Sequence, residues 1–379
     1  MLVSFRRVAV VTYAVIVFIA LTTYGIFWRK HGAIPISFLN IFGNPTFNSD
    51  SPDTKLPSTT NSPVTKLPST TNSPDIKLPS TTEQMASRFA YAQYATSLDY
   101  LCNTVINFNR LKNLGVQYDM VLIYPKTWDD EKTKAREAKA IRNLRSSHLD
   151  IVLRPFNVLS TEKGDSTWRD SLTKFHAFAL TDYTRVLAFD SDSLVLNNMD
   201  SLFLAPDSPV ALPRAYWLTE RNNGTVTQIL GSHLMLIEPN THLYEKIVNE
   251  ATQSGEFDME VMNELFKDSA MILPHRRIAL LTGEFRAKDH RKYLAPDEEE
   301  EWNPVNELNM AFLVHFSDWP LPKPWKSHSE AQWEAALPEC LDNDKEMPDL
   351  PRCADRMVWT GIYSDYDRDK AAYCQILGI

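Results

Sequence analysis

RVLAFDSDSLVL, residues 185–196, carries the strongest chemical signal in the sequence. The apolar run at Arg185–Phe189 predicts a buried strand, and Asp190-Ser191-Asp192 follow it directly. Two carboxylates one residue apart, just beyond a buried strand, suit a hard divalent cation that also binds phosphate oxygens. The alternative is a solvated turn or a helix cap, because aspartate is common in both. The apolar strand before the pair and the amphipathic stretch after it favour the metal site.

Alternating strands and helices surround this stretch. Strands are predicted at Phe89–Ala95, Asp119–Pro125 and Asp150–Phe156, and helices at residues 97–115, 171–180 and, as a solvated helix, 128–147. This alternation predicts an α/β fold with a mostly parallel sheet that is covered on both faces. Ligands of such sheets bind beyond the carboxyl ends of the strands, which is where Asp190 and Asp192 are expected.

The N-terminal region has the pattern of a membrane anchor. Residues 8–27 contain no charged residue, and as a helix they would span roughly 30 Å, the thickness of the hydrocarbon core. The segment before it, residues 1–7, is short and carries Arg6, Arg7 and the α-amino group. Arg29 and Lys30 on the other side nearly balance Arg6 and Arg7, so flanking charge by itself gives little orientation. Because the tail is only seven residues long and carries the α-amino group, we expect it in the cytosol and the bulk of the chain in the lumen. A cleaved signal peptide is the alternative, but so long an uncharged run is more typical of an uncleaved anchor.

The next segment, residues 28–85, is rich in Pro, Ser and Thr and contains a repeat with a period of eleven residues. KLPSTTNSPVT begins at Lys55, KLPSTTNSPDI at Lys66 and KLPSTT at Lys77. The unit has almost no apolar content, so it cannot bury enough surface to offset the entropy of ordering. We expect an extended stem that joins the anchor to a globular part beginning near residue 86.

Charge and cysteine content limit the possible functions. Lys and Arg total 39 against 48 Asp and Glu, a net charge of −9, which argues against a protein that binds nucleic acid through bulk positive charge. Cys340 and Cys353 bracket a Pro- and Asp-rich loop, where a local disulfide is expected. Cys102 is expected as a buried thiol on an apolar helix face. The sequon NGT predicts N-glycosylation of Asn223.

Two separated motifs carry a resemblance to a known family. SLTKFHAFALTDYTRVLAFDSDSLVLNNMDSLF (171–203) resembles the core signature of glycosyltransferase family 8, the glycogenin-like retaining transferases. HFSDWPLPKPW (315–325) is similar to the second signature of that family, and the match extends over residues 88–326. Within the family, LPHRRIALLTGEFR (273–286) most resembles the fungal Golgi alpha-1,2-N-acetylglucosaminyltransferases.

The resemblance implies a GT-A fold, with one Rossmann-like catalytic domain at residues 86–326 and a C-terminal extension at residues 327–379. It also implies a UDP-sugar donor, with Mn²⁺ between the D-x-D and the diphosphate. Carried over by position, it implies that Asp190, Asp192 and His315 bind the metal and that Lys323 binds the diphosphate. It assigns Ser191 to the donor ribose, and Tyr94, Thr96 and Tyr100 to the nucleobase and ribose. It assigns Lys174 to donor binding and catalysis, and Asp258 to catalysis near the transferred sugar.

These assignments have structural alternatives. Lys174 could lie on a solvated helix face, His315 could be a strand-end histidine with a structural hydrogen bond, Tyr94 and Tyr100 could be packing aromatics, and Asp258 could cap the helix expected at residues 259–266. The chain also departs from the family. Met259 replaces a Gln, GSHLM (231–235) replaces an Asn-Ser-Gly turn, and the spacing from His315 to Lys323 is longer. The first two differences leave the donor sugar open.

We therefore expect a type II Golgi membrane enzyme with a lumenal catalytic domain. With Mn²⁺, it would transfer N-acetylglucosamine from UDP-GlcNAc, with retention, to mannose residues of N-linked or mannan-type glycans. One alternative is UDP-glucose or UDP-galactose as donor. A second is a haloacid-dehalogenase-type phosphatase with Asp190 as nucleophile, but the acidic motif GDSTWRD (164–170) lies upstream, the reverse of that family's order. A third is a catalytically dead lectin-like or scaffold protein, against which the complete set of metal and phosphate residues argues.

Overall fold

The computed structural model of the protein describes residues 89–130, 132–163, 168–218, 220–222, 225–297, 299–340 and 352–378. The predicted anchor at residues 8–27, the stem at 28–85 and the sequon at Asn223 lie outside these ranges. Within them, none of the helices combines the length and the apolar character needed to cross a membrane.

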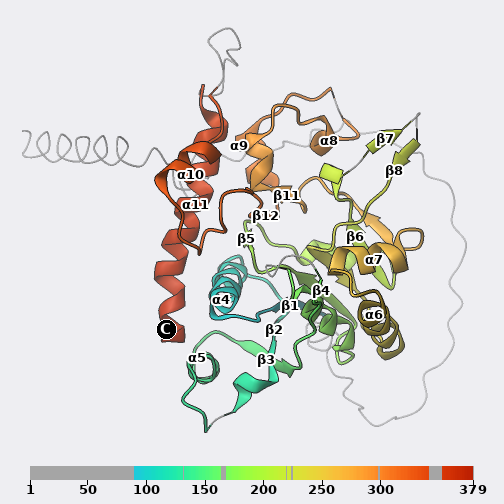
Figure 1. The fold of residues 1–379 in the computed structure, drawn as a ribbon, viewed down its shortest axis with the longest axis vertical. Coiled ribbons are helices and arrows are strands. Elements are labelled where there is room, and N and C mark those ends of the chain that lie inside the picture. Colours follow the sequence, from blue (N-terminus) through green and yellow to red (C-terminus); the bar gives the residue numbers. More distant parts are fainter. Residues whose placement is uncertain are drawn as a thin grey trace, which may run out of the picture.

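A central sheet of seven strands confirms the predicted α/β fold with a mostly parallel sheet (Figure 1). Its strands are β1 (Phe89–Tyr94), β2 (Asp119–Pro125), β3 (Ile151–Phe156), β4 (Arg185–Phe189), β6 (Val210–Pro213), β9 (Leu234–Ile237) and β10 (Met271–Leu273). They lie in the order β10-β6-β9-β4-β1-β2-β3. Only β9 runs against its neighbours β4 and β6; the other described pairs of this sheet are parallel.

Alternation along the strands gives the sheet two apolar faces. In β1, Tyr91 packs into one cluster of buried residues, and Ala90 and Ala92 pack into another. The helices α4 (Leu98–Asn113) and α5 (Arg136–Arg145) cover the Tyr91 face, while α6 (Thr241–Ser254), α7 (Asp258–Phe266) and the 3₁₀ helix η2 (Ser171–Ala179) cover the other. Because helices cover both faces of the sheet, the place left for a ligand lies beyond the carboxyl ends of the strands.

A smaller sheet joins two distant parts of the sequence beside that end. It contains β5 (Ser193–Val195), β11 (Leu280–Leu281) and β12 (Leu313–His315). Strand β12 pairs antiparallel with β5 in a register that sets His315 opposite Ser193. The backbone N–H of Phe316 donates a hydrogen bond to the Asp192 carbonyl over 3.0 Å. This pairing brings His315 to the D-x-D. The short strands β7 (Glu220–Asn222) and β8 (Thr225–Thr227) form a separate hairpin.

The helices after β11 pack beside the central sheet and its covering helices. These helices are α8 (Arg291–Leu294), α9 (Pro304–Met310), α10 (Glu330–Ala336) and α11 (Ala354–Tyr373). Elsewhere along the chain, the described 3₁₀ turns besides η2 are η1 (Lys126–Asp129), η3 (Asp200–Leu204), η4 (Tyr216–Leu218), η5 (Thr282–Arg286) and η6 (Cys374–Leu377). Helix α11 lies beside α4 and α9 (Figure 1). From α11, Trp359 Nε1 and Tyr363 OH donate hydrogen bonds to the buried Asp318 carboxylate, over 3.1 Å and 2.9 Å. The loop after β12 is thereby held to α11.

Two disulfides are present, and one corrects a prediction. Cys340 and Cys353 form the expected local bridge. Cys102 is not a free thiol: it forms a disulfide with Cys374, 272 residues later. The apolar face on which Cys102 lies does pack inward, and what it meets there is the end of α11. The pattern around Cys102 describes only its own helix, so it carries no sign of this partner.

Two predicted helices also differ in detail. The stretch 128–147 was expected to be one solvated helix, but its helical part is α5 with the short turn η1 before it. Ala140, Ile141 and Leu144 are buried, so α5 has an apolar face. The predicted helix 171–180 is the 3₁₀ helix η2, and nearly all of its side chains are buried. Lys174 therefore lies in the interior, and the solvated-face alternative for it is wrong.

Candidate active site

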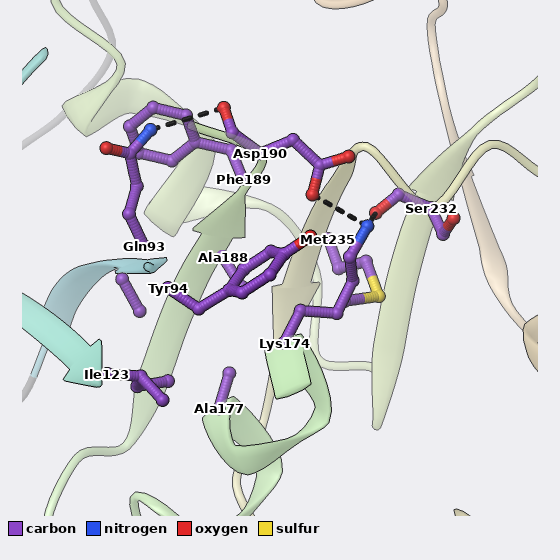
Figure 2. A pocket seen from close by; sticks show the side chains of 11 residues that line it. Gln93, Tyr94, Ile123, Lys174, Ala177, Ala188, Phe189, Asp190, Ser232 and Met235 are labelled. Atoms are coloured by element: carbon purple, nitrogen blue, oxygen red, sulfur yellow. Dashed lines mark hydrogen bonds and ion pairs between the residues drawn. The ribbon is translucent and has the colours of Figure 1, made fainter. Parts of the chain in front are cut away.

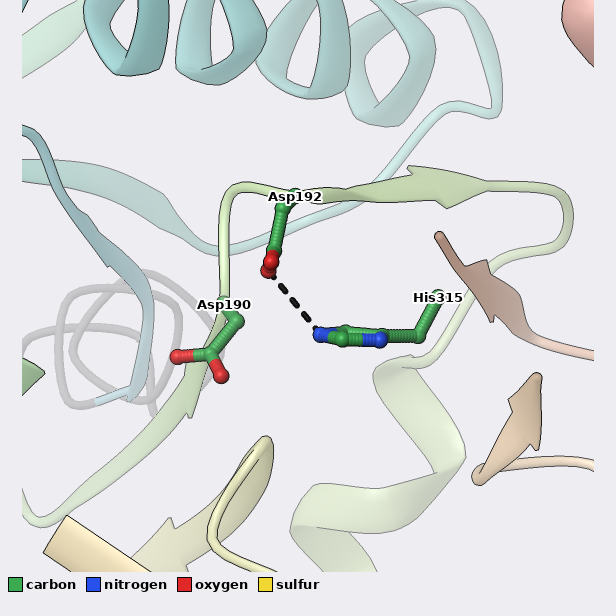
Figure 3. A group of neighbouring side chains, drawn as sticks. All are labelled: Asp190, Asp192 and His315. Carbon is green, nitrogen blue, oxygen red and sulfur yellow. Dashed lines mark ion pairs between the residues drawn. The ribbon is translucent and has the colours of Figure 1, made fainter. Parts of the chain in front are cut away.

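Asp190, Asp192 and His315 form a group able to hold a metal ion (Figure 3). Each offers one ligand atom, and these atoms lie within 4.8 Å of one another. Asp192 Oδ1 is 3.0 Å from His315 Nε2. Two carboxylate oxygens and one imidazole nitrogen form a donor set that a divalent ion such as Mn²⁺ accepts. The residues present therefore fit the metal that the sequence predicts, and their role as ligands stays a prediction.

Basic side chains surround Asp192. Besides His315, Lys323 lies close, with its Nζ 2.8 Å from Asp192 Oδ2. Burial alone would raise the pKa of Asp192, but His315 and Lys323 hold that pKa well below its usual value. Asp192 is thus a carboxylate throughout the ordinary pH range. Lys323 also donates a hydrogen bond to the Phe316 carbonyl, within the loop that follows β12.

A second charged cluster centres on Lys174, which is only 5% exposed (Figure 2). Its Nζ lies 2.6 Å from Asp190 Oδ1 and 2.7 Å from Asp258 Oδ2. The hydroxyl of Ser232 donates to the same Asp258 oxygen over 2.5 Å. Burial would favour a neutral amine, but the two carboxylates raise the pKa of Lys174 above its usual value. One buried cation thus links the metal group to Asp258.

The two carboxylates of this cluster differ in their pKa values. Burial raises the pKa of Asp190 to about 6, since the pull of Lys174 is partly offset by Asp192 and Asp258. Burial acts on Asp258 too, but Lys174, Ser171 and Ser232 together lower the pKa of this residue. Asp258 is the first residue of α7, and the cap position belongs to Phe257. Its carboxylate bonds to Lys174 and Ser232, so the helix-cap alternative does not describe it.

Two cavities meet at His315 of the metal group. The first, about 430 Å³, contains Lys174, Asp190, Asp192 and Asp258 in its wall, and we call it the Asp258 cavity. The second, about 690 Å³, contains Lys323, and we call it the Lys323 cavity. Six residues line both: Tyr94, Tyr100, Trp168, Ser171, His315 and Ser317. His315 therefore lies where one space passes into the other.

The residues assigned to the nucleotide line these cavities. Tyr94, Thr96 and Tyr100 all face the Lys323 cavity. Tyr94 also lies with its ring centre 5.8 Å from Lys174 Nζ, and Tyr100 packs edge-on against Trp325 at 5.3 Å. The two tyrosines thus pack and border the cavity at once. Ser191 is buried in the wall of the Asp258 cavity. No contact among the described residues tests their predicted roles.

Other residues at the site were not singled out by the sequence. Trp217, Ser232, His233 and Phe257 line the Asp258 cavity. Ser232 and His233 belong to GSHLM, whose departure from the family pattern was the one available signal. Burial, together with the nearby His315 and Lys174 side chains, lowers the pKa of His233 to about 3, so its ring is neutral. Trp217 lies after β6 in a stretch without any motif, and only the fold brings it here.

Curated relatives share much of this chain. It is 43% identical over 297 residues to glucose N-acetyltransferase 1 of Gibberella zeae, covering 77% of this chain and 64% of the relative. It is 38% identical over 298 residues to glucose N-acetyltransferase 1 of Aspergillus fumigatus, covering 74% and 76%. The chain thus spans just under two thirds of the length of the Gibberella protein. UDP-glucuronate:xylan alpha-glucuronosyltransferase 2 of Arabidopsis thaliana is 24% identical over 289 residues, covering 74% and 41%. No protein-family model matches.

Solved structures give weaker likenesses. A crystal structure of the galactosyltransferase LgtC with donor and acceptor sugar analogs has a TM-score of 0.44 at 15% identity, covering 65% of this chain and 95% of that one. The glycosyltransferase GlyE of Streptococcus pneumoniae has a TM-score of 0.44 at 14% identity, covering 74% and 64%. Both scores lie below 0.5.

Proposed function

The chain is a glycosyltransferase and belongs to the family of fungal proteins named glucose N-acetyltransferase 1, and we propose that it transfers N-acetylglucosamine from UDP-GlcNAc to mannose residues of N-linked or mannan-type glycans. The proposed reaction depends on Mn²⁺ and retains the configuration at the anomeric carbon. The proposal includes a GT-A catalytic domain of the family 8 type.

One observation carries the proposal: two cavities meet at His315, which belongs to the group formed with Asp190 and Asp192. A sugar nucleotide has the same three-part layout, with a nucleoside and a sugar on either side of a diphosphate. The Lys323 cavity, bordered by Tyr94 and Thr96, suits the nucleoside because aromatic rings stack on bases. The Asp258 cavity then takes the sugar.

The charged residues explain how the bond to the diphosphate would break. The anomeric carbon gives up its bond to the β-phosphate oxygen, so negative charge grows on the leaving group. The Nζ of Lys323 lies 2.8 Å from Asp192 Oδ2, so its positive charge can stabilise the negative charge that grows on the leaving diphosphate. Bound Mn²⁺ would add a Lewis acid at the diphosphate. Lys174 holds Asp190 and Asp258 in place, since its Nζ contacts both.

If the reaction retains configuration, as proposed, the surroundings of Asp258 favour one retaining route over another. Its carboxylate is engaged by Lys174 and Ser232, so it is poorly placed to act as a free nucleophile. We propose attack of the acceptor hydroxyl on the face that the diphosphate leaves. The acceptor oxygen forms the new bond to the anomeric carbon, and its proton passes to the β-phosphate oxygen.

The test is a product analysis with competing donors. Full-length protein in detergent is incubated with Mn²⁺ and a mannan acceptor, and with UDP-GlcNAc, UDP-glucose or UDP-galactose in turn. A further arm supplies acetyl-CoA and glucose, because the relatives' name is that of an acetyl transfer. Mannan carrying N-acetylglucosamine supports the proposal. Mannan carrying glucose or galactose would instead support the alternative donors. Acetylated glucose would contradict the proposal. Bound Mn²⁺ without any turnover would support the lectin-like or scaffold alternative.

We also propose that the protein is a Golgi membrane protein of type II, anchored by residues 8–27 with its catalytic domain in the lumen. Two disulfides among the described residues support an oxidising compartment. The protein should stay with membranes after a carbonate wash and co-fractionate with Golgi markers. Release by the wash would favour the cleaved signal peptide instead.

His315 and Lys323 should separate in a metal titration. His315→Ala removes an imidazole nitrogen from the metal group, so we expect Mn²⁺ to bind about 10- to 100-fold more weakly, and UDP with it. Lys323→Ala leaves both carboxylates and His315 in place, so Mn²⁺ affinity without nucleotide should change less than about threefold while UDP binding weakens. Calorimetric titration of Mn²⁺ with and without UDP measures both. Unchanged Mn²⁺ affinity in His315→Ala would assign this residue a structural role.

A further inference from the structure

His233 is a buried polar residue of the active site that the mechanism above does not use. Its side chain lines the Asp258 cavity and is 8% exposed. Within the described part of the chain, Nε2 of its ring has no hydrogen-bond partner. Buried polar atoms are nearly always paired in folded proteins, because leaving one unpaired is costly. A ligand in the cavity is therefore the natural partner of this nitrogen.

The ring of His233 is held in one place. The Asp190 N–H donates to the His233 carbonyl over 2.9 Å, which ties its backbone to the D-x-D. Its ring centre lies 5.8 Å from that of Trp217 and 5.9 Å from that of His315. A Cβ on Gly231 would come within 3.0 Å of two ring atoms, so glycine makes room for the imidazole. The nitrogen is thus fixed beside the metal group.

We propose that His233 and Trp217 recognise the 2-acetamido group of the donor sugar, an inference that rests on the proposed function. C2 of a pyranose is bonded directly to the anomeric carbon that carries the diphosphate. In the pose we propose, its substituent lies near the metal group when the sugar fills the Asp258 cavity. His233 lies at that position, with its ring beside His315.

The chemistry of an acetamido group matches both side chains. Its carbonyl accepts a hydrogen bond and its N–H donates one, so the acetamido group can pair with Nε2 of His233 whether that nitrogen donates or accepts. Its methyl group needs an apolar surface, which the Trp217 ring supplies, and Leu281 lines the same cavity. A hydroxyl at C2 lacks the carbonyl oxygen and the methyl group, so it is too short to pair with Nε2 and to fill the apolar surface as an acetamido group does. The pair of residues therefore favours a 2-acetamido sugar.

The experiment compares two donors in full-length wild type and in His233→Phe, which keeps a ring and loses both nitrogens. We expect kcat/KM for UDP-GlcNAc to fall about 10- to 100-fold, since one polar group is left unpaired. For UDP-glucose, kcat/KM should change less than about threefold, and so should the Kd of UDP with Mn²⁺. His275→Phe is the matched control: His275 is buried and bonded to the Tyr293 carbonyl, and it lines neither cavity.

Gly231→Ala provides a second variant if His233→Phe fails to fold. It keeps the imidazole and pushes it from its place, so the preference for UDP-GlcNAc over UDP-glucose should again fall. Equal losses with both donors, or an unchanged preference in a folded variant, would overturn the acetamido role while the transferase function stands. A wild type that transfers no UDP-sugar would instead overturn the proposed function, and this inference with it.

Discussion

Replacing Asp192 with asparagine is expected to lower sugar transfer by about 1,000-fold while the protein stays folded. The Asp192 carboxylate contacts His315 at 3.0 Å and Lys323 at 2.8 Å, so its negative charge keeps both side chains at the predicted metal site. Asparagine has the same size but no charge, and a divalent cation would bind far more weakly to it. Turnover is measured against Mn²⁺ concentration at saturating donor.

The activity deficit of Asp192→Asn should vary little with pH. Because the pKa of Asp192 is held well below its usual value, this carboxyl stays charged at every pH where the enzyme is assayed. The deficit of Asp192→Asn should therefore be equally large from about pH 5 to pH 8. Asp268→Asn, at an exposed position after α7, is the matched control and should keep full activity. Near-normal turnover of Asp192→Asn would remove the metal site from the proposal.

Lys174→Met should have the second large effect, on stability as well as activity. It removes the cation from between the half-buried Asp190 and the buried Asp258. Breaking a buried ion pair from one side costs about 3–5 kcal/mol of unfolding free energy, because the remaining charge has no partner. We also expect at least about 100-fold less transfer, since Asp190 loses the group that orients it. Thermal unfolding and turnover measure the two effects.

The stability loss should depend on pH. In wild type the pKa of Asp258 is lowered, so its contribution is present above the unfolded value of about 3.9 and is lost only at lower pH. Without Lys174, burial raises the folded pKa of Asp258 instead, and it raises that of Asp190 further. A raised pKa favours the folded state at low pH, and this contribution is lost as the pH rises through that pKa. The gap between Lys174→Met and wild type should therefore narrow as the pH falls from 7 towards 4.

Two further variants make this interpretation testable. Adding Asp258→Leu to Lys174→Met removes an unpaired charge, so part of the stability should return although activity does not. Lys267→Met, at an exposed position after α7, should leave both stability and turnover unchanged. A Lys174→Met protein as stable as wild type at neutral pH would contradict the central role of this lysine.

The sequence was sufficient for those parts of the fold that depend on local pattern. Strands such as β2 and β4 are continuous apolar runs, and a buried parallel sheet requires them. The D-x-D was recognisable because it follows β4 directly. His315 could be proposed only through the resemblance to a family, since its place beside Asp192 depends on the pairing of β12 with β5 across more than a hundred residues.

The remaining features depend on tertiary contacts that have no local signature. The 171–180 stretch reads as an ordinary helix with a lysine on its polar side, yet η2 is buried because α6 covers it. Trp217 reaches the cavity through the path of the chain after β6, which no motif encodes. GSHLM showed that the donor pocket was unusual, but not that the nitrogen of His233 would have no partner.

The pairing of the cysteines constrains the order in which the protein can be completed. Cys102 leaves the ribosome 272 residues before Cys374, and the Cys340–Cys353 bridge lies entirely inside the ring that Cys102 and Cys374 close. At about 5–20 residues per second, synthesis of that interval takes roughly 14–54 s. During that time two other thiols emerge before the correct partner of Cys102, and four cysteines allow three pairings. Rapid formation of the Cys340–Cys353 disulfide would remove the two competing thiols, so that Cys102 could pair only with Cys374. Cells short of disulfide isomerase should therefore accumulate this protein in mispaired forms that migrate differently on a non-reducing gel.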